Sequence, residues 1–312
     1  MGSIITLSIV QSALELGFIY ALVALALFIS FSILNIADLS TDGCFTLGCA
    51  VCASVTLAGH PVLGLLAAMA AGVCSGFVTA FLQTRLGIQS ILAGIIVNTG
   101  LYTINIAVMG FASNLNLFAC DSVFTWAKDA IGGTWYKLIV AAVIVALVGV
   151  LISLFLNTRL GLSIRATGDN PDMMITIGLC VANALTGLSG GLLAQYQKSC
   201  DINLGTGMVT IALASLIIGE TIIGKGSMLK RVIGVILGSC LYRFIVAVAL
   251  RLNVPAECLK LVSSIIVAVA IAFPYLKKQA VFYRQKRAAK AENEQYIAEL
   301  LREERMGKGG NA

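Results

Sequence analysis

Six long apolar stretches constrain this chain more than any other feature of its sequence. They are 19 to 28 residues long and cover 7–34, 62–82, 88–112, 138–156, 173–193 and 232–250. About 20 apolar residues cross a hydrocarbon core about 30 Å thick. Only 12% of the residues are charged and 59% are hydrophobic, whereas about a quarter are charged in soluble domains. We therefore predict an all-α fold, a polytopic bundle of membrane helices.

Three shorter apolar stretches, at 43–57, 209–223 and 261–276, are flanked or interrupted by Gly, Asp, Pro or Lys. We expect the last to be a full span and the other two to be broken or re-entrant helices, for about eight or nine spans in all. Non-helical backbone survives at membrane depth only where it is buried in protein or lines a cavity. Such a pair of interrupted segments, 38–57 and 201–223, is typical of a transporter's permeation path.

Charge is concentrated at the C-terminal end of the sequence. Of 36 charged residues, 14 lie in 277–312, which predicts a transmembrane domain over 1–276 and a basic, partly helical tail over 277–312. With this tail inside the cell, 15 Lys and Arg fall on the cytoplasmic side and five outside, as the positive-inside rule requires. The side of the N-terminus stays open. No basic face with interleaved aromatics suggests a nucleic-acid partner.

Two local patterns imitate known sites without their context. Residues 219–226 match a phosphate-binding loop at both glycines and the lysine, but Gly226 stands where Ser or Thr binds magnesium. The spacing of an iron–sulfur site recurs in an apolar helical stretch, where cysteine acts as a small hydrophobe; these residues are Cys44, Cys49 and Cys52. The only histidine, His60, has no neighbours with metal-ligand spacing. We therefore expect no metal, no bound nucleotide and no catalytic residue on this chain.

Ionisable residues inside membrane segments usually face the bundle interior or a water-filled path. Candidates here are Glu15, Asp38, Asp42, Glu220 and Arg243. Asp38 either caps the following helix or lines the path, and we expect Arg243 to pair with a carboxylate or with helix carbonyls. Amides on apolar helices either bridge helices or line a channel; they are Asn98, Asn105, Asn183 and Gln195.

Small residues indicate where helices approach closely. Two Gly-x3-Gly pairs and a glycine-rich run permit backbones to touch; the residues are Gly72, Gly76, Gly187, Gly190, Gly191, Gly234 and Gly238. The longest outer loop, 111–136, either docks an external partner or forms an ordered cap over the helices. Cys120 and Cys200 are predicted on the same, outer side of the membrane, and nothing else in the sequence supports a disulfide between them.

The most informative stretch, 158–179, connects two spans on the cytoplasmic side. Asn170 suits an N-cap, Pro171 the first helical position, and Asp172 the positive end of the helix dipole. We therefore predict a short exposed helix from Pro171 to about Ile177. Met173, Met174 and Ile177 would then be available to a partner.

At this point the sequence resembles the permease subunits of ATP-binding-cassette (ABC) importers of the branched-chain amino acid and ribose type. Thr158-Arg-Leu-Gly and Arg165-Ala-Thr-Gly-Asp-Asn-Pro resemble the segment that couples such permeases to their ATPase. Asp38-Leu-Ser followed by Gly43 is similar to the first broken helix of that family. Gly205-x-Gly207 onward to Gly224-Lys-Gly-Ser is similar to the second.

This resemblance implies a pathway subunit in the bacterial inner membrane, working with ABC ATPase subunits, an extracytoplasmic solute-binding protein and a second permease copy, identical or homologous. ATP and magnesium would bind to the ATPase. The solute would be an amino acid or similar molecule, or a sugar; aromatic amino acids are among the plausible solutes of the nearest branch. The alternative is a stand-alone secondary transporter or channel. The implied coupling residues are Arg165, Asp169, Asn170, Pro171, Asp172, Met173, Met174 and Ile177; the implied pathway residues are Asp38, Ser40, Asp42, Asn98, Gly205, Gly207 and Glu220.

Overall fold

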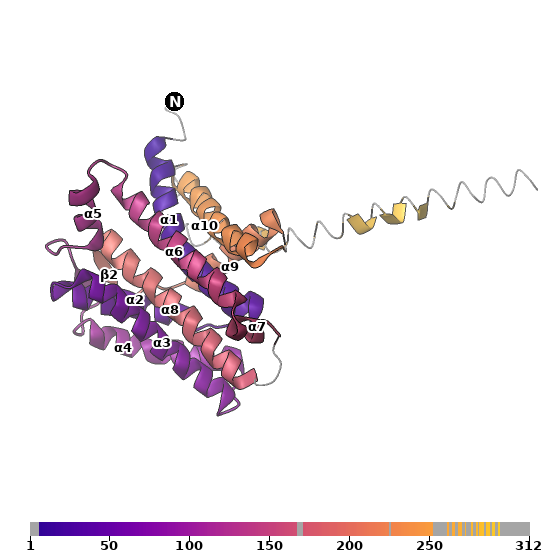
Figure 1. Cartoon of the computed structure of the whole chain (residues 1–312), viewed down its shortest axis with the longest axis horizontal. Helices are drawn as coiled ribbons and strands as arrows, with labels where there is room; N and C mark the ends of the chain where they lie inside the picture. Colours follow the sequence, from indigo (N-terminus) through magenta and orange to yellow (C-terminus); the bar gives the residue numbers. More distant parts are fainter. Residues whose placement is uncertain are drawn as a thin grey trace, which may run out of the picture. The chain divides into compact units, whose positions relative to one another are not determined.

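A computed structural model describes residues 6–166, 171–224, 226–251 and scattered positions between 261 and 293. Within these residues the chain is almost entirely helical (Figure 1). The elements are α1 (Leu7–Leu27), the π-helical η1 (Phe28–Ile33), α2 (Thr41–Leu57), α3 (Pro61–Thr84), α4 (Ser90–Val108), β1 (Asn114–Asn116), α5 (Val123–Ile131), α6 (Tyr136–Asn157), α7 (Arg159–Ala166), α8 (Pro171–Gln197), β2 (Ser199–Asp201), α9 (Met208–Ile223) and α10 (Met228–Arg251). Residues 268–312 form a separate unit, and the predicted boundary at residue 276 stays a prediction.

Six helices of the described part are long and apolar enough to cross a membrane, and they coincide with the six predicted spans. They are α1 with η1, α3, α4, α6, α8 and α10. The two predicted shorter helices are present as α2, with 17 residues, and α9, with 16. The chain is thus a polytopic membrane helix bundle. The stretch 261–276 lies largely outside the described residues.

Two spans form the centre of the bundle. In α1 and α8, 72% and 83% of the apolar window is buried, against 28 to 39% in the other four spans. Every side chain from Ile19 to Ile29 is buried. By contrast, α6 exposes Val143, Leu147 and Leu151, as expected of a helix with a face toward lipid. Among the six long spans, α1 and α8 are therefore the central ones, and the shorter α2, most of whose residues are also buried, belongs to the same core.

Glycines allow neighbouring helices to pack with their backbones in contact. A Cβ on Gly72 or Gly76 of α3 would collide with the backbone of Asn183 or Leu179 of α8. In the same way, a Cβ on Gly238 of α10 would collide with the carbonyl oxygen of Ser215 in α9. Both Gly-x3-Gly pairs therefore lie at close helix contacts, as predicted.

The long loop before α6 is an ordered cap. Strand β1 pairs antiparallel with β2, with Leu115 opposite Cys200. Helix α5 begins with a capping box formed by Ser122 and Thr125. The side chain of Gln195, at the end of α8, accepts a hydrogen bond of 3.0 Å from the backbone N–H of Val123. Cys120 and Cys200 are both free.

The predicted short helix from Pro171 to Ile177 is wrong as a separate element. These residues are the first turns of α8, which continues to Gln197. The helix continues through Gly178, and a Cβ at that position would collide with the side chain of Leu34. The separate short helix at this end of the bundle is α7. Its Ile164 is fully buried and belongs to one apolar cluster with Leu34, Ile36, Ala80, Met174 and Leu179.

Candidate functional site

The two short helices, α2 and α9, begin at the same place. The carboxylate of Asp42, in the first turn of α2, accepts backbone hydrogen bonds of 2.9 Å from Gly207 and from Val209. The hydroxyl of Thr46 accepts a third, of 3.1 Å, from the N–H of Gly205. Asp42 therefore caps α9 from another helix, using the free N–H groups that every helix start presents. Gly207 has a left-handed φ of 86°, which glycine adopts without strain.

A cavity of about 200 Å³ lies beside this meeting point. Helix α4 contributes several polar side chains to it, and the loop before α9 contributes others. Among the predicted pathway residues, Asp42, Asn98 and Gly205 line this cavity, and Gly207 is bonded to Asp42. The described residues that line it are Asp42, Gly43, Thr46, Asn98, Thr99, Tyr102, Asn105, Ile202, Asn203, Gly205 and Thr206.

Asp38 and Ser40 belong to a buried network that leads up to α2. One oxygen of Asp38 accepts hydrogen bonds from the backbone N–H and the hydroxyl of Ser40, at 2.9 and 2.5 Å. The other accepts one of 2.8 Å from the amide of Asn183 in α8, and Thr79 of α3 donates to the Ser40 hydroxyl. The capping prediction is wrong, because the N-cap position of α2 is Ser40 and has no side-chain cap. Asp38 instead ties the segment before α2 to α3 and α8.

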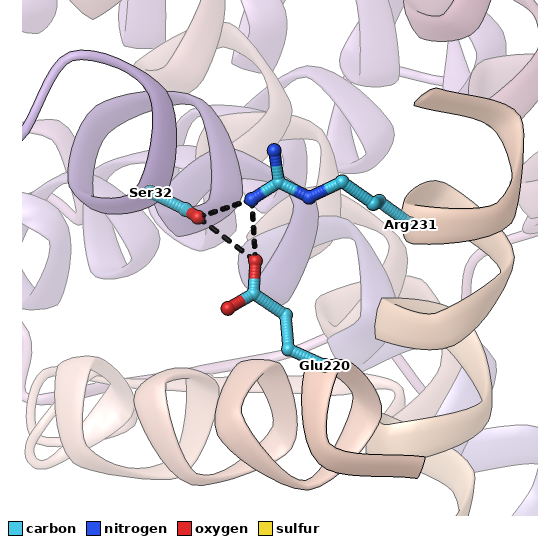
Figure 2. Close-up of polar contacts among 3 residues, drawn as sticks. All are labelled: Ser32, Glu220 and Arg231. Carbon is cyan, nitrogen blue, oxygen red and sulfur yellow. Dashed lines mark hydrogen bonds and ion pairs between the residues drawn. The ribbon is translucent and has the colours of Figure 1, made fainter. Parts of the chain in front are cut away.

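Glu220 lies near the opposite end of α9, about 20 Å from Gly207 at 1.5 Å per residue. Its carboxylate forms an ion pair of 2.6 Å with Arg231 of α10 and accepts a hydrogen bond of 2.9 Å from Ser32 of η1 (Figure 2). Arg231 also donates to Ser32 and stacks on Phe28. This cluster joins three elements and does not line the cavity near Asp42.

The remaining polar groups mostly bridge helices. Tyr196 donates to Glu15 at 2.8 Å, linking α8 to α1. Arg243 departs from our expectation: among the described residues its guanidinium has no carboxylate partner and lies 3.4 Å from the ring centre of Tyr20. Such a cation–π contact stabilises a buried guanidinium. The sequence contains no signal for this pairing. It also contains none for the hydrogen bonds of Thr46 with Gly205 and of Ser32 with Glu220.

A model of the family described as "branched-chain amino acid transport system, permease component" matches residues 9–271. The chain belongs to this family of permeases. It is 33% identical over 272 residues to a tyrosine transport system permease protein of Clostridioides difficile (strain R20291), covering 84% of this chain and 90% of that protein. An uncharacterised protein of Rickettsia prowazekii (strain Madrid E) is 29% identical over 287 residues, covering 85% and 97%. No solved structure matches significantly.

The chain is therefore a permease subunit of an ABC importer, a transport protein that crosses the inner membrane several times. This membership also decides against the stand-alone secondary transporter or channel. The family as a whole implies an ATPase and a binding protein as partners.

At the end of the permease where α8 begins, a groove of about 750 Å³ separates α8 from the end of α3. The groove is lined by Phe77, Phe81 and Thr84 of α3, by Arg85 directly after α3, and by Asp172, Met173, Thr176 and Ile177 of α8. The side chain of Met173 is 52% exposed, and its role in binding a partner stays a prediction.

Met174 differs from its prediction, because it points into the apolar cluster with Leu34 and Ile164. Arg165 and Pro171 lie in α7 and α8. Asp169 and Asn170 fall outside the described residues.

Proposed function

We propose that this permease imports an amino acid through the region where α2 and α9 meet. The observation that carries the proposal is a cavity lined mainly by polar residues, at the place where the two short helices begin. Polar side chains in a cavity can bind the charged ends of a small zwitterionic solute. The printed name of the Clostridioides relative, a tyrosine transport permease, supports an amino acid as the solute.

The proposed topology follows from helix length. At 17 and 16 residues, α2 and α9 each extend about 25 Å, short of a hydrocarbon core about 30 Å thick. We therefore propose that they are half-helices that begin inside the membrane and leave it on opposite faces, in a fold of eight or nine spans. The excess of Lys and Arg in the tail and near α7 favours a cytoplasmic C-terminus.

The ATPase subunits, which would hold ATP and magnesium, are proposed to bind the start of α8 together with α7. Asp172 and Met173 are exposed there beside the groove. Ile164 and Met174 belong to one apolar cluster with Leu34 and Ile36. Leu34 and Ile36 precede Asp38 by four and two residues. A movement of α7 and α8 therefore reaches Asp38, Ser40 and the start of α2 through direct contacts. This route would link ATP hydrolysis to the cavity.

At the opposite end, the cap formed by β1 and α5 is the proposed docking surface for the solute-binding protein. It exposes large aromatic side chains, which are typical of protein interfaces; they are Phe111, Phe118 and Trp126. A second permease copy, identical or homologous, would complete the pathway.

The test combines purification with transport. The tagged permease should co-purify with an ABC ATPase and, reconstituted with it and the binding protein, should take up labelled L-tyrosine or another amino acid only with ATP. Met173→Ala should reduce ATP-driven uptake without reducing the amount of inserted protein. Leu151→Ala, an equally exposed position on the lipid-facing side of α6, is the matched control. Wild-type uptake by Met173→Ala, or uptake without any ATPase, would contradict the proposal.

A further inference from the structure

Asn105 of α4 is a buried amide with an unused oxygen. Its side chain is 1% exposed, and its Nδ2 donates a hydrogen bond of 3.1 Å to the carbonyl of Gly43. This bond fixes the orientation of the amide and leaves Oδ1 without a partner among the described residues. A buried acceptor without a donor destabilises a folded protein. Asn105 is among the residues that line the cavity, so a donor that enters the cavity and reaches Oδ1 would remove this penalty.

Asp42 supplies a second acceptor to the same cavity. Each of its oxygens accepts one backbone N–H from the start of α9, and a carboxylate oxygen has room for about two hydrogen bonds. Among the residues that the structure describes, no Lys or Arg lines this cavity. The single ion pair of the described residues lies elsewhere, between Glu220 and Arg231. The start of α9 offsets only about half a charge, so the cavity keeps a negative character.

Two acceptors and a residual negative charge suit a cationic donor. We propose that this cavity is a solute site within the permease that recognises the ammonium group of an amino acid through Asp42 and Asn105. The amides of Asn98 and Asn203 and the hydroxyl of Thr206 supply donors for the carboxylate. A volume of about 200 Å³ is below the 300–1,000 Å³ typical of drug-sized ligands and fits a molecule of amino-acid size. This inference rests on the proposed function and adds to it the group that is recognised.

The proposal predicts which half of an amino acid the site requires. The full-length permease with its co-purified ATPase, in lipid nanodiscs and without the binding protein, is titrated with two series of probes. One series is L-tyrosine, tyramine and 3-(4-hydroxyphenyl)propanoate; the other is L-leucine, 3-methylbutylamine and 4-methylpentanoate. In at least one series the amino acid and the amine should bind, while the acid that lacks the amine should bind at least tenfold more weakly.

Two variants locate the site. Asn105→Ala removes the free acceptor and should weaken binding of the amine about tenfold, the usual effect of losing a hydrogen bond to a charged group. Asp42→Asn removes the charge and should weaken it further. Asn157→Ala, which removes an exposed amide of α6 that is outside the cavity, is the control and should bind like the wild type. Because Asp42 also caps α9, thermal unfolding is measured for each variant. If Asp42→Asn does not fold, the binding of the amine to Asn105→Ala tests the proposal.

Three results would overturn the proposal: equal binding of the acid and the amine, unchanged amine affinity in folded Asn105→Ala, or no binding of any of the six probes. None of these three results contradicts the proposed function. That proposal is contradicted by other results: no ATPase co-purifies, or uptake does not require ATP.

Discussion

Replacing Glu220 with Gln tests whether the cluster of Ser32, Glu220 and Arg231 holds α9, α10 and η1 together. The side chains of Arg231 and Glu220 are only 14% and 21% exposed. Gln keeps the size of Glu220 and accepts a hydrogen bond from Arg231, so the substitution removes little besides the negative charge. Arg231 would then be a largely buried cation without a carboxylate partner; its other contacts among the described residues are Ser32 and the ring of Phe28.

The magnitude follows from the geometry. Two unit charges 2.6 Å apart attract by about 6 kcal/mol at an effective dielectric of 20. Desolvation of both groups offsets most of this attraction, and the part that is exposed is screened by solvent. We expect Glu220→Gln and Arg231→Gln each to lower the free energy of unfolding by about 2–3 kcal/mol. Because the double variant leaves no unpaired charge, it should lose at least 1 kcal/mol less than the sum.

Buried thiols provide the assay. Cys44, Cys49 and Cys52 are fully buried, so a fluorescent maleimide reaches them only when the helices separate. Labelling is followed while the purified permease is unfolded reversibly in mixed micelles with increasing denaturing detergent. A coupling energy below about 0.5 kcal/mol in the double-mutant cycle would refute the reasoning, because it would mean that Glu220 and Arg231 contribute independently.

Three further predictions use other contacts. Gly48→Ala should lower the yield of folded permease and destabilise it by about 1–3 kcal/mol, because a Cβ there collides with the backbone of Gly187; a size-exclusion profile and thermal unfolding measure this, with Gly100→Ala, where the Cβ meets open space, as the control. Asn183→Leu should destabilise the protein by about 1–3 kcal/mol, because one oxygen of Asp38 loses its donor, and a stability equal to the wild type in thermal unfolding would contradict the proposed network. Ile164→Ala should lower the number of solute molecules imported per ATP hydrolysed while leaving membrane insertion intact, because it weakens the contact of α7 with Leu34 and Ile36; an unchanged ratio would argue against this route of coupling.

Much of the architecture could be predicted from the sequence because it depends on hydropathy and on local residue size. The six long spans, the two shorter helices and the close contacts at Gly72, Gly76 and Gly238 are all present. The site was predicted less completely. Asp42, Asn98 and Gly205 do line one cavity, but Asp38 and Ser40 form a separate buried network, and Glu220 is in an ion pair at the far end of α9.

The misses concern where a helix ends and which partner a polar side chain finds. The pattern Asn170-Pro171-Asp172 predicts a helix start at Pro171 but does not specify where that helix ends, and in the structure α8 continues to Gln197. Arg243 has a cation-binding partner of another class, the ring of Tyr20. A sequence pattern specifies that a buried charge needs a partner, not which one it has.

By itself, the sequence determined three things: that this chain is a membrane protein, which residues form its spans, and which family it resembles. These properties depend on composition, periodicity and short motifs. Only the tertiary structure decided that Asp42 caps a helix 165 residues away, at Gly207, and that Ser32 and Glu220, 188 residues apart, share a hydrogen bond. The physical reason is that helix packing brings together groups that are distant along the chain. In an apolar bundle, each polar group is satisfied by whichever partner that packing supplies.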